Sequence, residues 1–130
     1  MRGHSAEAPD GRRGGGGASG DGGAGPAGQA EGGAGNDSIY GGNGPDTLYG
    51  QNGSDWLVGN DGNDLLNDAG LDGTVNRLYG GNGNDSVYGG NARDYIYGEA
   101  GEDQLFGYDG DDYLDGGYGR DWLFGHNGWD

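Results

Sequence analysis

A nine-residue repeat constrains the fold of this chain more than any other feature. The repeat first occurs at residues 32–40, with the sequence Gly-Gly-Ala-Gly-Asn-Asp-Ser-Ile-Tyr, and it recurs up to the last residue. Each copy has glycines near its start, a carboxylate at position six and an apolar residue at position eight. A short fixed period means that one structural unit is stacked on itself, so we expect a solenoid.

The copies can be read directly from the sequence, with one interruption. A twelve-residue stretch, 68–79, breaks the period and looks like a repeat with three extra residues and Asn76 in place of Asp. The regular copies are 32–40, 41–49, 50–58 and 59–67 before it, and 80–88, 89–97, 98–106, 107–115, 116–124 and the partial copy 125–130 after it. The predicted organisation is therefore a repeat block at 32–67, an interruption at 68–79 and a second block at 80–130 that ends mid-repeat.

The first 31 residues differ from the repeats in composition. They are mostly Gly, Ala and charged residues with almost no large apolar side chains, so residues 1–31 are expected to be a disordered tail. No apolar core of a secretory signal is visible near Met1, and no stretch is apolar enough to span a bilayer. The chain has no Cys, which excludes disulfides and thiolate metal sites.

The net charge of −16 limits the partners. Nucleic acid is excluded as an expected partner because phosphate binding needs a basic patch, and anionic membrane surfaces are disfavoured for the same reason. Cations are favoured.

The turn of each repeat has the chemistry of a calcium site. Glycines at positions one, two and four give the backbone freedom to aim several carbonyl oxygens into one space, and the Asp at position six adds a carboxylate. Calcium takes six to eight oxygen ligands in flexible geometry, whereas transition metals prefer His or Cys, which these turns lack.

Positions seven to nine are expected to form a strand whose position eight points inward. Every residue of this inward row is a branched aliphatic: Ile39, Leu48, Leu57, Leu66, Leu78, Val87, Ile96, Leu105, Leu114 and Leu123. Such a row can form the core of a stacked fold.

Residues 32–130 resemble the RTX (haemolysin-type) calcium-binding repeat. The resemblance implies an all-β fold, a right-handed parallel β-roll (β-solenoid) with two nonapeptides per turn, in which calcium lies between repeat n and repeat n+2. It implies carboxylate pairs Asp37–Asp55, Asp46–Asp64, Asp85–Asp103, Asp94–Asp112, Asp103–Asp121 and Asp112–Asp130, about six clear calcium (Ca²⁺) sites in two ladders. The implied metal ligands are these Asp side chains together with turn positions Gly32, Gly35, Gly41, Gly44, Gly50, Gly53, Gly80, Gly83, Gly89, Gly98, Gly101, Gly107, Gly110, Gly116 and Gly119.

Several residues depart from the repeat. Asn76 provides an uncharged amide, so sites that include it should be weak, and the pairing of Asp64 with Asp85 depends on how the extra residues loop out. Ala92 replaces the fourth glycine of its copy and should strain that turn. The second glycine is replaced in five copies, by Gln51, Asn60, Glu99, Tyr108 and His126.

These features predict that folding depends on calcium. The aliphatic row is small relative to the backbone entropy of a glycine-rich chain, and stacked carboxylates repel until a cation neutralises them. We therefore expect a chain that is largely unfolded without calcium and folded with it. The resemblance, with an extracellular range of calcium affinities, implies a secreted module.

Aromatic residues at positions seven and nine should face outward and stack at a spacing of eighteen residues, for example Tyr79 with Tyr97. Cross-strand packing is the favoured interpretation, and a glycan or protein partner for this surface is the alternative. No catalytic motif is found, so the chain is not expected to be an enzyme. Two alternatives to a structural calcium-binding module are a calcium-dependent adhesion module and the non-catalytic end of a larger RTX protease or lipase.

Overall fold

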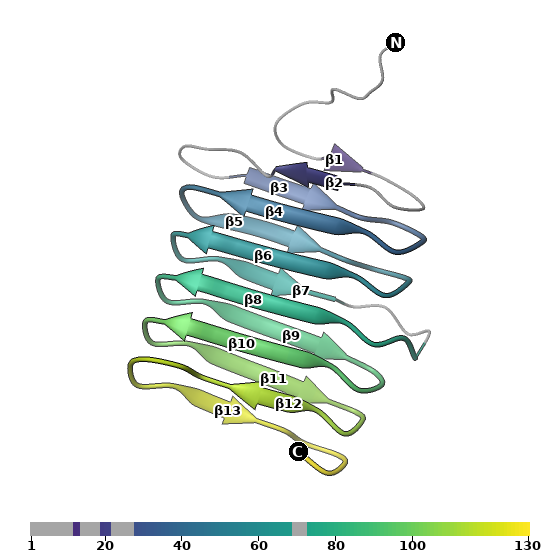
Figure 1. The fold of residues 1–130 in the computed structure, drawn as a ribbon, viewed down its shortest axis with the longest axis vertical. Coiled ribbons are helices and arrows are strands. Elements are labelled where there is room, and N and C mark those ends of the chain that lie inside the picture. The colour runs from purple at the N-terminus through teal and green to yellow at the C-terminus, as the bar shows by residue number, and fades with distance from the viewer. Residues whose placement is uncertain (1–11, 14–18, 22–27, 69–72) are drawn as a thin grey trace.

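The computed structural model describes residues 12–13, 19–21, 28–68 and 73–130. These residues form a parallel β-solenoid whose successive strands alternate between two sheets (Figure 1). The first sheet contains β1 (Arg12–Arg13), β3 (Gly28–Glu31), β5 (Asp46–Tyr49), β7 (Leu65–Asn67), β9 (Ser86–Gly90), β11 (Gln104–Tyr108) and β13 (Trp122–Phe124). The second contains β2 (Ser19–Asp21), β4 (Ser38–Gly42), β6 (Trp56–Asp61), β8 (Arg77–Asn82), β10 (Tyr95–Ala100) and β12 (Tyr113–Asp115).

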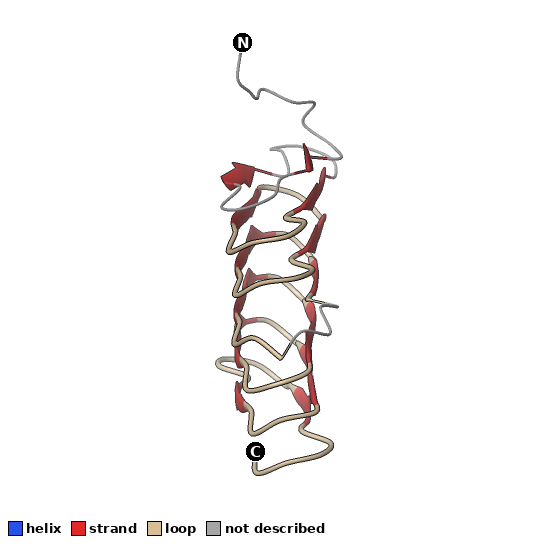
Figure 2. Ribbon diagram, turned by 90° about the vertical axis from the view of Figure 1, so that its right-hand side faces the viewer, coloured by secondary structure: helices blue, strands red, loops and turns tan. Residues whose placement is uncertain are grey.

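The pairing register confirms two nonapeptides per turn. Ile39 pairs with Leu57 and Leu105 with Leu123, and all named strand pairs are parallel. In Figure 1 the chain runs leftward along the nearer sheet and rightward along the farther one as it descends, so the coil is right-handed, as predicted. Figure 2 shows the two sheets from the side, joined by the turns.

The interruption changes the length of one turn without shifting the register. Across it, Leu57 pairs with Leu78 and Leu66 pairs with Val87, a step of 21 residues instead of 18. The three extra residues are therefore accommodated between β7 and β8, as predicted, and the aliphatic row continues unbroken.

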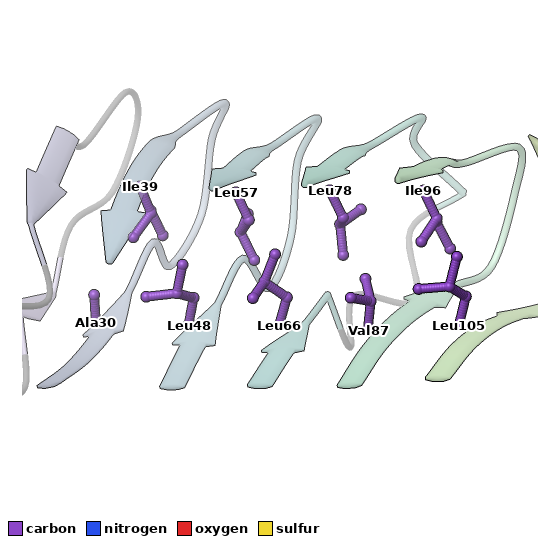
Figure 3. Close-up of a cluster of buried hydrophobic side chains, with 9 residues drawn as sticks. All are labelled: Ala30, Ile39, Leu48, Leu57, Leu66, Leu78, Val87, Ile96 and Leu105. Atoms are coloured by element: carbon purple, nitrogen blue, oxygen red, sulfur yellow. The ribbon is translucent and has the colours of Figure 1, made fainter. Parts of the chain in front are cut away.

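The aliphatic row forms the core between the sheets (Figure 3). Its members from Ile39 to Leu105 are 0–2% exposed, and Leu114 packs against them partly buried. Leu123 pairs in register with the core residue Leu105, as the inward row predicts, and it is 44% exposed because no later turn covers it in the structure. Strand β6 shows the expected alternation: Trp56 is exposed, Leu57 is buried and Val58 is half-buried.

Strand pairing extends N-terminal to the repeat block predicted from residue 32. Strand β3 pairs with β5 and places Ala30 in the core with no exposed surface. The nine-residue frame extends one period back, with Ala30 at position eight, although Gly28 occupies position six in place of Asp. Strands β1 and β2 lie within the predicted tail and pair with β3 and β4; the rest of that tail, 1–11, 14–18 and 22–27, lies outside the described residues.

The turns require left-handed backbone, as the glycine pattern indicates. The non-glycine residues with positive φ in the described chain are the six that replace repeat glycines: Gln51, Asn60, Ala92, Glu99, Tyr108 and His126. Ala92 has a φ of 84°, so the predicted strain in its turn is present. At position four the glycine is also needed for space: a Cβ on Gly83, whose φ is 120°, would overlap the Gly62 carbonyl of the turn above.

Candidate metal centres

The position-six side chains lie in two rows, one along each edge of the solenoid. We call the edge at the right of Figure 1 the interrupted edge; its position-six residues are Asp37, Asp55, Asn76, Asp94, Asp112 and Asp130. We call the opposite edge the continuous edge; its position-six residues are Asp46, Asp64, Asp85, Asp103 and Asp121. Each turn precedes a strand of the next sheet, so the stacking of the strands positions the carboxylates.

From Asp55 and Asp64 onward, one oxygen of each carboxylate joins neighbouring turns. The Oδ1 atom accepts a hydrogen bond from the backbone N–H of the position-six residue two repeats earlier, for example Asp55 Oδ1 from Asp37 N–H at 2.9 Å. The same bond joins the other five predicted pairs, Asp46–Asp64, Asp85–Asp103, Asp94–Asp112, Asp103–Asp121 and Asp112–Asp130, at 2.8–2.9 Å. The structure thus brings together every carboxylate pair that the family resemblance implied.

The other oxygen faces the glycine at position one of its own repeat. The point where a Cβ of Gly32 would lie is 2.5 Å from Asp37 Oδ2 and 2.8 Å from the Gly50 carbonyl oxygen. The equivalent point at Gly41 is 2.7 Å from both Asp46 Oδ2 and the Gly59 carbonyl oxygen. Because position one lacks a side chain, a carboxylate oxygen and a carbonyl oxygen face the same small space. We call this arrangement an oxygen pair.

The oxygen pairs are buried. Asp64, Asp85, Asp94, Asp103 and Asp112 are 0–5% exposed, and the Oδ2 atom of each has no hydrogen-bond donor. Buried polar atoms in proteins almost always have a partner. The Oδ2 atoms of these five carboxyl groups are therefore suited to coordinate a cation.

The charges of these carboxylates are strongly disfavoured by their surroundings. Burial raises the pKa of Asp85 to about 8 and that of Asp94 to about 7, and it raises the pKa values of Asp64, Asp103 and Asp112 to about 6. Hydrogen bonds from backbone N–H groups oppose the shift, and neighbouring carboxylates of the row add to it. A cation between the turns would offset both the energetic cost of desolvating the carboxylates and the repulsion between them.

The donor set fits a hard divalent cation. All candidate ligands are carboxylate and carbonyl oxygens, the ligands that calcium takes. Within the described residues, no three acidic or His side chains converge on one point, so a cation here would need backbone carbonyls or water as further ligands. The carbonyls of position-one glycines contribute to the oxygen pairs, whereas those of position-four glycines, such as Gly35 and Gly44, lie against the position-four glycine of the next turn on the same edge.

The interruption keeps the ladder of the continuous edge intact. Asp64 N–H donates to Asp85 Oδ1 at 2.8 Å across the 21-residue step, so this pair forms although the sequence left it open. On the interrupted edge, Asp55 N–H donates to Asn76 Oδ1 at 2.8 Å, and Asn76 N–H donates to Asp94 Oδ1 at 3.0 Å.

Sequence reasoning missed one residue of this site, Asp68. Its carboxylate is 2% exposed, accepts a hydrogen bond from Asn76 Nδ2, and places Oδ1 2.6 Å from the Cβ point of Gly50, where other turns place a glycine carbonyl oxygen. The available signal was its place in the frame: Asp68 follows position nine directly, so it stands where the other copies begin with glycine.

Outside the sheets, aromatic rings form stacked columns. Tyr88, Phe106 and Phe124 stack at centroid distances of 4.8 and 4.9 Å, and Tyr108 stacks on His126 at 5.1 Å beside them. On the other sheet Tyr79 stacks on Tyr97 at 4.9 Å, as predicted, and Arg77 lies over the Tyr95 ring. Tyr108 and Phe124 are 38% and 42% exposed.

Comparison with known protein families matches residues 31–66, 72–105 and 106–130 to the RTX calcium-binding nonapeptide repeat (4 copies). Comparison with curated proteins and with solved structures gave no significant match. Within the described part of the chain there is no helix that is long and apolar enough to cross a membrane.

Proposed function

This chain belongs to the RTX calcium-binding nonapeptide repeat family, and from this premise we propose that it is an extracellular, non-catalytic module whose repeats fold when calcium binds. The Asp carboxylates and the glycine carbonyls of the turns hold the ions. Calcium supplies positive charge and is coordinated by oxygen atoms of successive turns. The aliphatic row packs once the turns are joined.

The observation that carries the proposal is the set of buried Oδ2 atoms along both edges. Carboxylates at the strand spacing of about 4.8 Å repel by roughly 3–4 kcal/mol per pair at an effective dielectric of about 20. The row from Asp46 to Asp121 contains only acidic side chains at position six. Such a row favours the unfolded chain unless cations separate its charges, which couples folding to binding.

The test is a calcium titration of the chelated full chain, followed by far-ultraviolet circular dichroism with magnesium as the control ion. We expect a cooperative transition from coil to β-structure with calcium and none with magnesium, because magnesium requires a tighter octahedral shell and retains its waters. Unchanged β-structure after exhaustive chelation would contradict the proposal.

A matched pair of variants makes the titration specific to the site. Asp103→Asn removes one buried charge but keeps the Oδ1 atom that accepts the Asp85 N–H, and we expect a higher calcium midpoint. Glu102→Gln makes the same charge change at the adjacent exposed residue and should leave the midpoint nearly unchanged. Equal shifts of the calcium midpoint in the two variants would indicate that calcium binding depends on the net charge of the chain rather than on the oxygen pairs.

The proposal that the module is extracellular depends on the affinity of the repeats for calcium. Extracellular calcium modules bind at roughly 10⁻⁴–10⁻³ M, so a transition midpoint in this range would leave the chain unfolded in a low-calcium cytosol and folded outside the cell. A midpoint at micromolar calcium or below would contradict this part of the proposal.

The aromatic columns favour a second candidate function, a calcium-dependent surface for a glycan or protein. Tyr88, Phe106 and Phe124 offer parallel rings along one sheet, and exposed apolar patches can mark binding sites. A ligand screen at constant calcium, with wild type and Tyr88→Thr/Phe106→Thr, tests this function. Loss of a ligand at unchanged stability would support it, and loss of stability alone would assign the columns to packing.

A further inference from the structure

Asn76 shares one hydrogen bond with the Asp residues of the two edges and differs from them in its amide nitrogen. Its side chain is 1% exposed, and its Oδ1 atom accepts the Asp55 N–H at 2.8 Å. This is the role that Oδ1 of Asp plays in the regular turns. The amide nitrogen, Nδ2, therefore occupies the place where the regular turns present Oδ2.

The amide N–H₂ group faces three oxygen atoms, one from each of two neighbouring carboxylates and one from a backbone carbonyl. Nδ2 donates to Asp68 Oδ2, to Asp94 Oδ1 at 3.1 Å and to the Thr74 carbonyl oxygen at 3.3 Å. An amide N–H₂ group has donors and no acceptor, so it cannot ligate a metal ion and its partial positive charge repels one. The residues at this position therefore do not fit calcium.

We infer that hydrogen bonds from the Asn76 amide replace calcium coordination at this rung, by which we mean the level of the interrupted edge where Asn76 lies between Asp68 and Asp94, and that the rung binds no metal. This inference rests on the proposed function for the other rungs. The interrupted edge then has a metal-free rung at the insertion, whereas the continuous edge has oxygen pairs at each described turn from Gly41 to Gly98.

The backbone at Asn76 keeps the hydrogen bonds of the regular turns, and Thr74 adds one more. Arg77 N–H donates to the Asp55 carbonyl at 2.9 Å, just as Trp56 N–H donates to the Asp37 carbonyl at 2.8 Å in a regular turn. Thr74 Oγ1 donates to the Gly53 carbonyl at 2.6 Å, which ties the longer turn to the turn before it. Asp68, the acidic residue that the insertion brings into the row, is the residue whose charge the Asn76 amide offsets.

The test is the number of bound calcium ions, measured by native mass spectrometry at saturating calcium. Asn76→Asp restores a carboxylate beside Asp68 and Asp94, and we expect it to bind one more ion than the wild-type chain. Asn63→Asp is the matched control. Asn63 Oδ1 also accepts a backbone N–H from a residue 21 positions along, Asn84, at 2.8 Å, but Asn63 is exposed at position five of its repeat and should add no ion. An equal ion count in folded Asn76→Asp and wild type would overturn the inference.

A crystal structure of the wild-type chain grown in calcium tests the rung without a variant. We expect ions at regular turns and none among Asp68, Asn76 and Asp94; an ion coordinated there would overturn the inference. A wild-type chain that binds no calcium at any turn would instead overturn the proposed function, so the two failures are distinguishable.

Discussion

The two edges of the solenoid carry the same repeat and differ in one turn. On the continuous edge, every position six is Asp and successive carboxylates join through the same hydrogen bond, including Asp64 to Asp85. On the interrupted edge, three extra residues, Asn76 and Asp68 change the chemistry of one rung while the strands keep their pairing. The difference teaches that ligand chemistry and stacking are specified separately: stacking follows from position eight, and ligand chemistry follows from the turn.

The largest expected difference between the edges comes from glycine substitutions. In Gly83→Ala on the continuous edge, the new Cβ would overlap the Gly62 carbonyl at a φ of 120°, and we expect a loss of more than ~3 kcal/mol in the free energy of unfolding. In Gly73→Ala on the interrupted edge, φ is 76° and nothing lies within 4 Å, so the loss should be about 1 kcal/mol. Urea unfolding in saturating calcium measures both, and equal losses would show that the edges do not differ in packing.

The next prediction is a mutation whose effect on the free energy of unfolding changes sign when calcium is removed. Asp85→Asn gives the continuous edge the side chain that the interrupted edge has in Asn76, and it keeps the Oδ1 that accepts the Asp64 N–H. With calcium we expect one ion fewer and a loss of roughly 1.4 kcal/mol for a site at about ten times its dissociation constant. After chelation we expect the variant to be more stable than wild type, because a buried carboxylate with a raised pKa has been removed. Destabilisation in both conditions would contradict this account.

A pH effect of intermediate size follows from the raised pKa values. Folded-state pKa values of about 6 to 8 lie above the ordinary value, so the folded chain binds more protons than the unfolded chain. The resulting stability is fully present below the ordinary pKa near 4 and is lost as the pH rises through 6 to 8.

In chelated protein, far-ultraviolet circular dichroism should therefore show more β-structure at pH 5 than at pH 8. Asp85→Asn should remove the part of this transition nearest pH 8, since the pKa of Asp85 is about 8 whereas those of Asp64 and Asp103 are about 6. A chelated chain that gains β-structure as the pH rises would contradict the sign.

The smallest effect distinguishes the outer faces of the sheets rather than their edges. Tyr88 and Phe106 are parallel at 4.8 Å, whereas Tyr95 and Tyr113 are tilted at 6.4 Å. Aromatic pairs contribute about 0.5–1.5 kcal/mol beyond their buried area, and we expect the coupling energy of the first pair to be near the upper value. Double-mutant cycles to Thr in calcium measure both couplings; a stronger coupling for the tilted pair would overturn the expectation.

Much of the fold could be predicted because period and chemistry agree. The aliphatic residue at position eight sets the register, and the Asp at position six falls eighteen residues from its partner as a direct result. The residues that replace repeat glycines in the sequence, such as Gln51 and Glu99, are residues with positive φ in the structure.

The features that could not be predicted are in parts of the sequence that depart from the nine-residue repeat. Strand β3 was missed because Ala30 is a small core residue and Gly28 stands where Asp marks the other copies. Asp68 was missed because its side chain, rather than a backbone carbonyl, reaches the row, and the path of three extra residues is not encoded in the frame. The pairing of Asp64 with Asp85 stayed open for the same reason.

The 21-residue step between Leu57 and Leu78 indicates that a turn of this solenoid can hold extra residues while its strands stay paired. Strand pairing is in register on both sides, so added chain between Asp68 and Gly73 need not displace the core. The entropy of closing a flexible loop grows slowly, by about 0.6 kcal/mol for each doubling of its length. The turn is therefore a natural insertion point at which a foreign peptide or a small domain could be grafted, with the stacked strands serving as a rigid scaffold.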